Sequence, residues 1–303
     1  MKKNPNKIRT LTPSRIIFNI INYAIFGIFA FVCIYPMYYV AIYTLSVPAL
    51  AQKNTVVLYP LGLSLFNLRK VLTIDGIWNA VFISVARTVL GTCLTVLVCM
   101  FLGYAFSKQH FPARKFLYRM LVITMYVHGG MVPTYLVFRA YGLLNTFWVY
   151  IIPAMISAYY VILIKTFVEQ IPPSLEESAF IDGAGYITVF LRIIFPMCLP
   201  IVATIAIYAA VHQWNSWFDN HVYVFGNKRV TTLQYMLYRY LQEAERLIKE
   251  IEQSSTEREI GDMLTPFGVR MAVTLITVIP VMFVYPFLQR YIIKGIMIGA
   301  VKG

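Results

Sequence analysis

Long apolar runs alternate with short polar segments along most of this chain. The runs cover residues 16–47, 77–106, 118–138, 147–168, 197–218 and 268–293. Each is long enough to cross the hydrocarbon core of a bilayer, which takes about 20 consecutive apolar residues. The pattern predicts an all-α polytopic membrane protein with six transmembrane helices, so that both ends of the chain lie on the same side.

Polar segments flank and interrupt this transmembrane domain, which covers residues 16–293. Residues 1–15 and 294–303 form short tails, and the two longest interruptions are residues 169–196 and 219–267. The basic start followed by apolar residues has the order of a secretory signal. However, the first run is much longer than the apolar region of a signal peptide, about 7–15 residues. We interpret it as an uncleaved first span.

The composition supports a membrane protein, because 59% of the residues are hydrophobic and 13% are charged, against about 25% charged in soluble domains. The net charge of +13 would indicate nucleic acid for a soluble chain. Here we interpret the positive residues as topology signals, because short cytoplasmic segments are enriched in lysine and arginine. Most of these residues lie on the side of the two termini. This bias predicts N-in and C-in, with residues 169–196 cytoplasmic, residues 219–267 extracytoplasmic and no nucleic-acid partner.

Motifs for catalysis and cofactor binding are absent from the sequence. It contains no G-x-x-x-x-G-K-[ST] phosphate loop, no H-E-x-x-H and no G-x-S-x-G. The four histidines are scattered, and the four cysteines lie in or beside apolar runs without a C-x-x-C pair, so we predict no metal site. We expect no cofactor and no catalytic site. Any uphill transport would then take its energy from an ion gradient or from another subunit.

One segment between two apolar runs does not fit the bilayer, namely residues 169–200, EQIPPSLEESAFIDGAGYITVFLRIIFPMCLP. Pro172 and Pro173 can open a helix but cannot lie deep inside one. Asp182-Gly183 is a turn signal, and the carboxylates of the segment would be costly in lipid. We therefore predict a helix–turn–helix on the cytoplasmic side, held at both ends by spanning helices.

The residue spacing within this segment is more specific. It places Glu177-Ser178-Ala179 before Asp182-Gly183-Ala184, followed by Phe190, Ile193 and Pro196. This spacing resembles the EAA motif of ATP-binding-cassette (ABC) importer permeases, with Ser178 in place of the middle alanine. Other stretches are similar to the carbohydrate importer permeases, and among them to the LplC/YtcP-like branch that imports oligosaccharides from plant or bacterial polysaccharides: Gly129–Pro133, Trp214–Trp217 and Tyr285–Tyr291.

The resemblance implies a type I ABC importer permease fold and a transport role without chemistry of its own. It implies three kinds of partner besides the lipid bilayer: a second homologous permease subunit, two cytoplasmic ABC ATPase domains that bind the ATP, and an extracytoplasmic sugar-binding protein. The location that it implies is the bacterial cytoplasmic membrane. The motif residues would couple the permease to the ATPases.

The chemistry of the motif residues fits the role of coupling the permease to the ATPases. Glu177 can pair with a basic group on an ATPase, Asp182 is placed to cap the second helix, and Gly183 permits a tight approach. The other members are small residues that let another surface come close (Ser178, Ala179 and Ala184) and residues that anchor the second helix or end it at the fifth span (Phe190, Ile193 and Pro196).

Candidate substrate contacts lie in or near the spans. Arg87 is in the middle of one, where an unpaired charge costs about 2.5–3.5 kcal/mol, so it should face substrate, a water-filled cavity or a partner on another helix. If it faces substrate, an acidic oligosaccharide is favoured. The remaining candidates are polar or aromatic groups that suit sugars, although an interfacial belt or bundle packing also explains them: Tyr126, His128, Tyr159, Tyr160, Tyr208, His212, Gln213 and Trp214.

An amphipathic helix is predicted at residues 232–252, because apolar residues recur there at i, i+3 and i+4. It either packs on the spans of its own chain or forms a docking surface for an external partner. For the whole protein, the alternatives to a sugar permease are a permease of the same architecture for another solute, an ion-driven carrier, a membrane enzyme or a structural scaffold.

Overall fold

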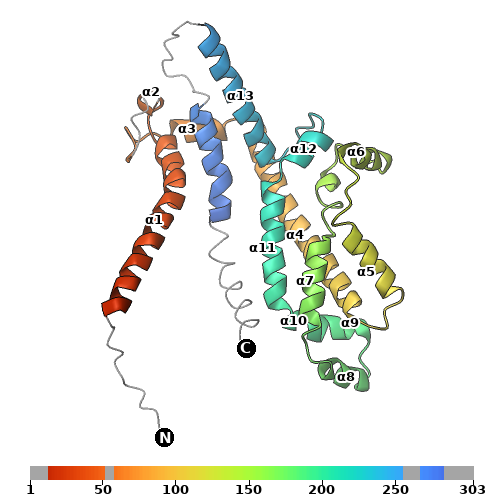
Figure 1. The fold of residues 1–303 in the computed structure, drawn as a ribbon. Helices are drawn as coiled ribbons and strands as arrows, with labels where there is room; N and C mark the ends of the chain where they lie inside the picture. Colours follow the sequence, from red (N-terminus) through yellow and green to blue (C-terminus); the bar gives the residue numbers. More distant parts are fainter. Residues whose placement is uncertain (1–12, 52–57, 255–266, 283–303) are drawn as a thin grey trace. The chain divides into compact units, whose positions relative to one another are not determined.

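The computed structural model describes residues 13–51, 58–254 and 267–282, and most of these are helical (Figure 1). The last described helix is Phe267–Met282. The elements before it are α1 (Pro13–Thr44), α2 (Pro48–Ala51), α3 (Phe66–Leu72), α4 (Ile77–Ser107), α5 (Arg114–Ile123), α6 (Met131–Ala140), the 3-10 helix η1 (Phe147–Tyr150), α7 (Ala158–Val168), α8 (Ser174–Ile181), α9 (Tyr186–Val189), the π-helix η2 (Phe190–Ile194), α10 (Phe195–Met197), α11 (Leu199–Asn215), α12 (Phe218–Tyr223) and α13 (Leu233–Ser254).

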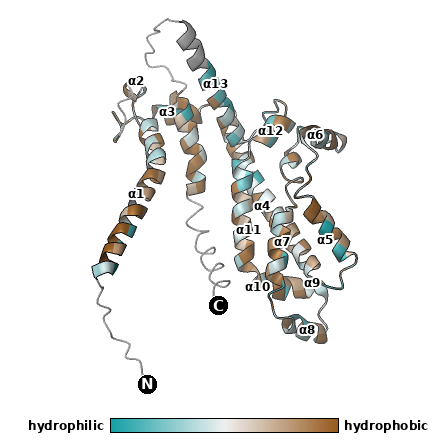
Figure 2. Ribbon diagram, viewed as in Figure 1, coloured by the Kyte–Doolittle hydropathy of each residue, from teal (hydrophilic) through white to brown (hydrophobic). Residues whose placement is uncertain are grey.

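The chain divides into two compact units. Unit 1 comprises Met1–Lys70 and Thr256–Leu275, and unit 2 comprises Val71–Ser255 and Ile276–Gly303. In unit 1, α1 is hydrophobic along most of its length (Figure 2), and its apolar side chains are exposed over most of the helix. Only its last turn is buried within the unit, where Tyr43 contacts the ring of Phe267 at 4.8 Å. Most of the apolar surface of α1 is therefore left uncovered by the rest of unit 1.

The long helix α4 is the centre of unit 2 and packs against α11 and α7. At two points these helices approach α4 so closely that a Cβ atom added to α4 would force a neighbouring group to move. A Cβ atom on Gly91 would lie 2.6 Å from Nε2 of Gln213 in α11, and one on Gly103 would lie 2.5 Å from Cγ2 of Ile164 in α7. Such contacts are typical of membrane helix packing, in which small residues let backbones approach.

Two predicted spans are not continuous helices. The run at 118–138 contains the end of α5 and most of α6, and the helix is broken before Gly130, which has a φ of 83° that favours glycine. The run at 147–168 contains η1 and α7 with turns between them around Pro153, which has no backbone N–H to continue a helix. Neither run is therefore one uninterrupted helix, and the number of six transmembrane helices stays a prediction.

The other predicted spans agree better with the structure. Among the described residues, α1 and α4 are long and apolar enough to cross a bilayer, and Tyr186–Met197 with Leu199–Asn215, bent by 80°, is a candidate third span. These correspond to the runs at 16–47, 77–106 and 197–218. Of the sixth run, the structure describes a helix to Met282, and its remainder, like residues 1–12 and the tail at 294–303, lies outside the described residues.

The chain passes back and forth between two ends of unit 2. One end, called here the α8 end, contains α8, the C-terminus of α4 and the N-terminus of α5, joined by the ion pairs Lys108–Glu176 and Arg114–Glu169. The other, the α13 end, contains α12, η1 and the start of α13, joined by the Tyr150 Oη–Val230 O hydrogen bond of 2.8 Å. The broken segments α5–α6 and η1–α7 therefore still connect opposite ends.

Candidate functional site

The predicted helix–turn–helix is present as α8, a turn and α9. α8 follows the Pro172-Pro173 pair, and Asp182 is its C-cap. The second helix has Gly185 at its N-cap and no side-chain capping bond, so the prediction that Asp182 caps it is wrong. Gly183 has a φ of 83°, and no heavy atom lies within 4 Å of a Cβ added there. The turn thus needs glycine here for its positive φ, and not because a neighbouring group within the chain leaves no room for a side chain.

Adjacent acidic residues in the first turns of α8 point in different directions. Glu176 is 9% exposed; its Oε1 forms an ion pair with Nζ of Lys108, and its Oε2 accepts a 3.5 Å hydrogen bond from the Tyr104 hydroxyl. Lys108 also lies over the Tyr104 ring, 4.6 Å from the centroid. Glu177 is exposed. Glu176 therefore attaches α8 to the end of α4, and the charge of Glu177 is on the outer surface.

The remaining motif residues on α8 and the turn divide in the same way. Ser178, Asp182 and Gly183 are exposed, whereas Ala179 and Ala184 are half-buried against the core of unit 2. Between them, the side chain of Ile181 is 85% exposed. The surface that the turn presents is consequently acidic and apolar, with small residues that leave the backbone accessible.

After the turn, the chain is anchored in the bundle. Phe190 is 8% exposed and lies 5.3 Å from the Tyr104 ring, centroid to centroid. Ile193 is half-buried against the same core. Pro196 is exposed and precedes, by two residues, the break at Cys198 where the helix bends by 80° into α11. These positions agree with the predicted anchoring and with the predicted junction to the fifth span.

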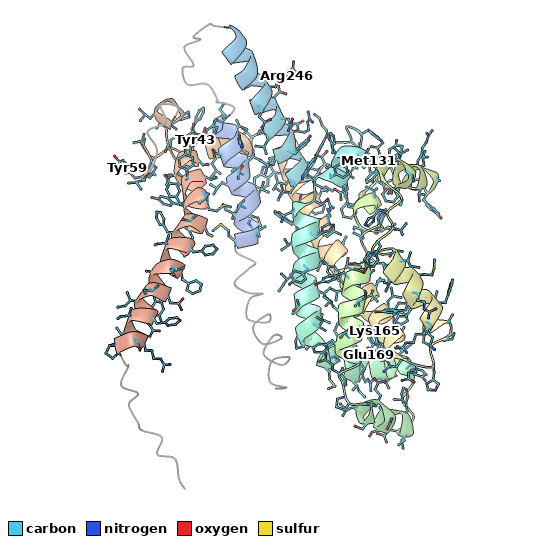
Figure 3. All side chains as sticks on the ribbon, viewed as in Figure 1. Tyr43, Tyr59, Met131, Lys165, Glu169 and Arg246 are labelled. Carbon is cyan, nitrogen blue, oxygen red and sulfur yellow. The ribbon has the colours of Figure 1, made fainter. Side chains whose placement is uncertain are left out.

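A second ionic cluster holds the chain before α8. Lys165 at the end of α7 pairs with Glu169 at 2.8 Å, and Arg114 at the start of α5 pairs with the same carboxylate at 3.1 Å. Figure 3 shows Lys165 and Glu169 close together where α7 ends. Two cations on neighbouring helices thus fix the point from which the segment 169–196 leaves the bundle.

Arg87 is buried at the α13 end and is fully engaged within the chain. Its side chain is 2% exposed. Nε donates to Oε1 of Gln213 at 2.8 Å, Nη1 donates to Ser216 O at 3.1 Å, and both terminal nitrogens bind the carboxylate of Asp219. The guanidinium carbon also lies 4.5 Å from the ring centroid of Tyr150. Of the explanations that the sequence left open for this charge, the structure shows a partner on another helix.

Asp219 was missed by sequence reasoning, although a signal was available. A buried arginine in a span requires an acidic partner, and Asp219 follows the fifth span directly at the end where Arg87 lies. Because this carboxylate neutralises the guanidinium, Arg87 gives no support to an acidic substrate.

Apart from Gln213, the other candidate pathway residues do not form one site with Arg87. Gln213 shares its hydrogen bond, and Trp214 is buried beside it, with Nε1 donating to Thr277 O at 3.0 Å. Tyr160 is half-buried against the core. The remaining candidates are exposed to different extents along unit 2: Tyr126, His128, Tyr159, Tyr208 and His212. In residues 13–51, 58–254 and 267–282, no group of three histidine, cysteine, aspartate or glutamate side chains could hold a metal ion.

The predicted amphipathic helix at 232–252 is confirmed as α13. Its start packs on its own chain, because Leu233 is 1% exposed and the Trp217 ring stacks on Tyr238 at 4.1 Å between centroids. Burial raises the pKa of the Tyr240 phenol, and the nearby Arg239 opposes the rise. The first of the two interpretations thus holds for the first turns of the helix, and docking of an external partner stays a prediction.

Comparisons with known proteins place this geometry in context. Residues 11–298 match the family described as "Binding-protein-dependent transport system inner membrane component". The chain is 31% identical to the polygalacturonan/rhamnogalacturonan transport system permease protein YtcP of Bacillus subtilis, covering 95% of this chain and 99% of that protein. It is also 31% identical to the protein LplC of Bacillus subtilis, covering 95% of each chain. A chain in the crystal structure of a bacterial ABC transporter involved in the import of the acidic polysaccharide alginate superposes with a TM-score of 0.81 at 26% identity, covering 92% of this chain and 98% of that one.

Proposed function

The chain belongs to the family of binding-protein-dependent transport system inner membrane components, and from this premise we propose that it is the permease subunit of an ATP-driven oligosaccharide importer. Members of this family are membrane components of transport systems and are not catalytic subunits. The single observation that carries the coupling assignment is the position of the E-S-A and D-G-A residues, which lie on an exposed helix and turn at one end of unit 2.

The relatives support a carbohydrate as substrate and favour an acidic one. YtcP is named for polygalacturonan and rhamnogalacturonan, and the structural neighbour for the acidic polysaccharide alginate. Galacturonate and the sugars of alginate carry carboxylates. We infer that this chain serves the import of oligosaccharides derived from such polysaccharides. Arg87 contributes nothing to this inference, because Asp219 already neutralises it.

The α8 end is the place where ATPase domains would attach. Glu177 is available for a basic partner, and Ile181 for an apolar pocket. α8 is bonded to α4 through Glu176 and is joined through the turn to α11. A rigid-body movement of an ATPase would therefore reach the spanning helices directly. The full proposal has six spans, several of them broken, with the α8 end and both termini in the cytoplasm.

The assembly would contain a second permease subunit, two ATPase domains and an extracytoplasmic sugar-binding protein. The spans would alternate between outward-facing and inward-facing cavities as the ATPases close and open. ATP can shift that equilibrium only if it favours one of the two states. In this proposal the preference would come from the coupling turn, if its contacts with the ATPases differ between their closed and open forms.

Uptake by the reconstituted transporter tests the function. Proteoliposomes that contain the complete transporter and its binding protein should accumulate oligogalacturonates when ATP is enclosed. Glu177→Lys reverses an exposed charge and Gly183→Pro cannot adopt the positive φ of the turn, so both should lose uptake while they still insert in the membrane. Wild-type uptake in both variants would contradict the coupling assignment.

The same proteoliposomes distinguish the proposed function from two alternatives. A permease of this architecture for another solute would show ATP-dependent stimulation only with that solute, and binding assays on the external receptor would identify it. An ion-driven carrier would accumulate solute without ATP when an ion gradient is imposed. Co-purification of ATPase subunits with the chain favours the proposed importer.

A further inference from the structure

α4 reaches from one end of unit 2 to the other. It has 31 residues and no internal proline, so it is about 45 Å long at 1.5 Å per residue. The close approaches at Gly91 and Gly103 tie it to α11 and α7. A continuous helix packed in this way moves as one body, because bending or sliding would break backbone hydrogen bonds or interdigitated contacts.

Polar side chains near the N-terminus of α4 hold the segment 216–233, which leads into α13. All are contributed by the first three turns of the helix, and they bond both backbone and side-chain groups. Asn79 donates to the carbonyl oxygens of Lys228 and Arg229 at 2.9 and 3.0 Å, Ser84 accepts from the backbone N of Leu233 at 2.8 Å, and Arg87 binds Ser216 O and Asp219. The start of α13 is therefore attached to α4 by several independent bonds.

The C-terminus of α4 holds α8 through one ion pair. Lys108 is the C-cap residue of α4, and its ammonium group binds Glu176. The two side chains are 25% and 11% exposed, so the pair is largely shielded from water. Removing one member of such a pair leaves the other poorly solvated. Of the adjacent acids of α8, Glu176 therefore faces α4 and Glu177 faces outward, toward the proposed ATPase.

We propose that α4 is a rigid connection between α8 and the α12–α13 segment, and that Lys108–Glu176 and Arg87–Asp219 are the ion pairs that position its two ends. Arg87 and Lys108 are about 30 Å apart along the helix. This proposal rests on the proposed function, in which the ATPases move α8. Movement of α8 then displaces α4 and changes the α12–α13 surface on the opposite side of the membrane, so that this surface reports the nucleotide state.

Both ion pairs are positioning contacts rather than contacts to a substrate. Helix packing lets α4 follow α7 and α11, and Ala179 and Phe180 also pack α8 against the core, but these apolar contacts do not fix α8 to the end of α4 as a directed polar bond does. The Lys108–Glu176 bond supplies that constraint. At the other end, the bidentate Arg87–Asp219 geometry fixes both the distance and the orientation of α12.

Amide hydrogen exchange on the complete transporter in nanodiscs tests the connection without any knowledge of the substrate. Exchange is compared between the nucleotide-free state and the state trapped with ATP and orthovanadate. In the wild type, we expect trapping to change exchange in two regions, residues 170–185 and residues 216–233. In Lys108→Glu, or in Lys108→Gln if the reversal prevents assembly, the change at 216–233 should be lost while the change at 170–185 remains.

Two further variants make the test specific. Asp219→Asn should also lose the change at 216–233, and the double variant Lys108→Glu/Glu176→Lys should regain it, because the ion pair is restored with opposite polarity. The matched control is Asp75→Lys, since Asp75 and Lys228 form a pair at the α13 end that is 88% and 81% exposed. This control should respond to trapping as the wild type does.

The possible failures are distinguishable. If trapping changes residues 170–185 but not 216–233 in the wild type, the rigid connection is wrong and the proposed coupling at α8 stands. Persistence of the change at 216–233 in both Lys108→Glu and Asp219→Asn also overturns the connection, as does a double variant that stays defective. If trapping changes neither region, the coupling at α8 is wrong, and the connection is wrong with it.

Discussion

The two ends of unit 2 differ in how far their side chains are satisfied within the chain. At the α13 end, the charged Arg87 and the polar Gln213 are each 2% exposed and are hydrogen-bonded to each other. At the α8 end, the apolar side chains of Ile181 and Ile187 are 85% and 70% exposed. The α13 end thus buries a cation that is bonded within the chain, whereas the α8 end, besides the buried Glu176, exposes strongly apolar side chains on and beside its acidic turn.

Under the proposed function, this difference predicts that the α8 end is the one completed by another protein. Apolar side chains that face the hydrocarbon are covered by lipid, but α8 is predicted to lie outside it, where an exposed apolar surface marks an interaction site. The α13 end has its buried cation neutralised by Asp219. We therefore expect substitutions near Arg87 to act on stability, and substitutions on the outer face of α8 to act on assembly and transport.

The largest effect is expected from Asp219→Ala, which leaves the Arg87 guanidinium buried without its anion. Removing one partner of a buried pair destabilises a protein by about 3–5 kcal/mol. The thermal midpoint of the purified complex in detergent should fall strongly, with a lower yield from membranes. Asp75→Ala is the control, because the Asp75 side chain is 88% exposed, and it should leave the midpoint near that of the wild type.

A double variant sharpens the interpretation of this effect. Arg87→Met/Asp219→Leu replaces the buried pair with apolar groups of similar size, which is often neutral or stabilising. It should therefore recover most of the stability that Asp219→Ala loses. If the double variant is as unstable as the single one, the loss comes from the shape of the site and not from the uncompensated charge.

An intermediate effect is expected from Gly103→Ala in the core between the two ends. The added Cβ would lie 2.5 Å from Cγ2 of Ile164 and 3.2 Å from the backbone N of Lys165, so α4 and α7 must separate. Overpacking of this kind costs about 1–3 kcal/mol, which a thermal-shift measurement would detect. Gly27→Ala in α1 is the matched control, because nothing lies within 4 Å of its Cβ position. It should be neutral or slightly stabilising.

Periodicity predicted the elements that depend on local sequence. The apolar run of α4 and the amphipathic pattern of α13 were located to within a few residues, because each is a continuous signal. The breaks between α5 and α6 and between η1 and α7 were missed, since average hydropathy stays high across Gly130 and Pro153. A backbone that changes direction within an apolar run is visible only in its turn residues.

The contacts that decide the roles of the charged residues were harder to predict from the sequence. Glu176 and Glu177 are adjacent and chemically equal, and the partners that bind Glu176 as the inward-facing one, Lys108 and Tyr104, lie 68 and 72 residues before it. Likewise, Arg87 required a partner, but its choice of Asp219 depends on the meeting of α4 with the end of α11. Such pairings over long sequence separations follow from tertiary structure, and a single sequence does not specify them.

The smallest effect on stability and a clear effect on assembly are expected from Ile181→Ser on the outer face of α8. Because Ile181 is 85% exposed, its replacement should change stability by no more than about 0.5 kcal/mol. If an ATPase pocket covers this side chain, however, less ATPase should co-purify with the variant, and uptake should fall in proportion. Leu63→Ser is the control, because Leu63 is 81% exposed and belongs to unit 1. Equal ATPase recovery from both variants would show that the α8 end is not the apolar contact surface, and the contrast between the two ends would then lose its functional meaning.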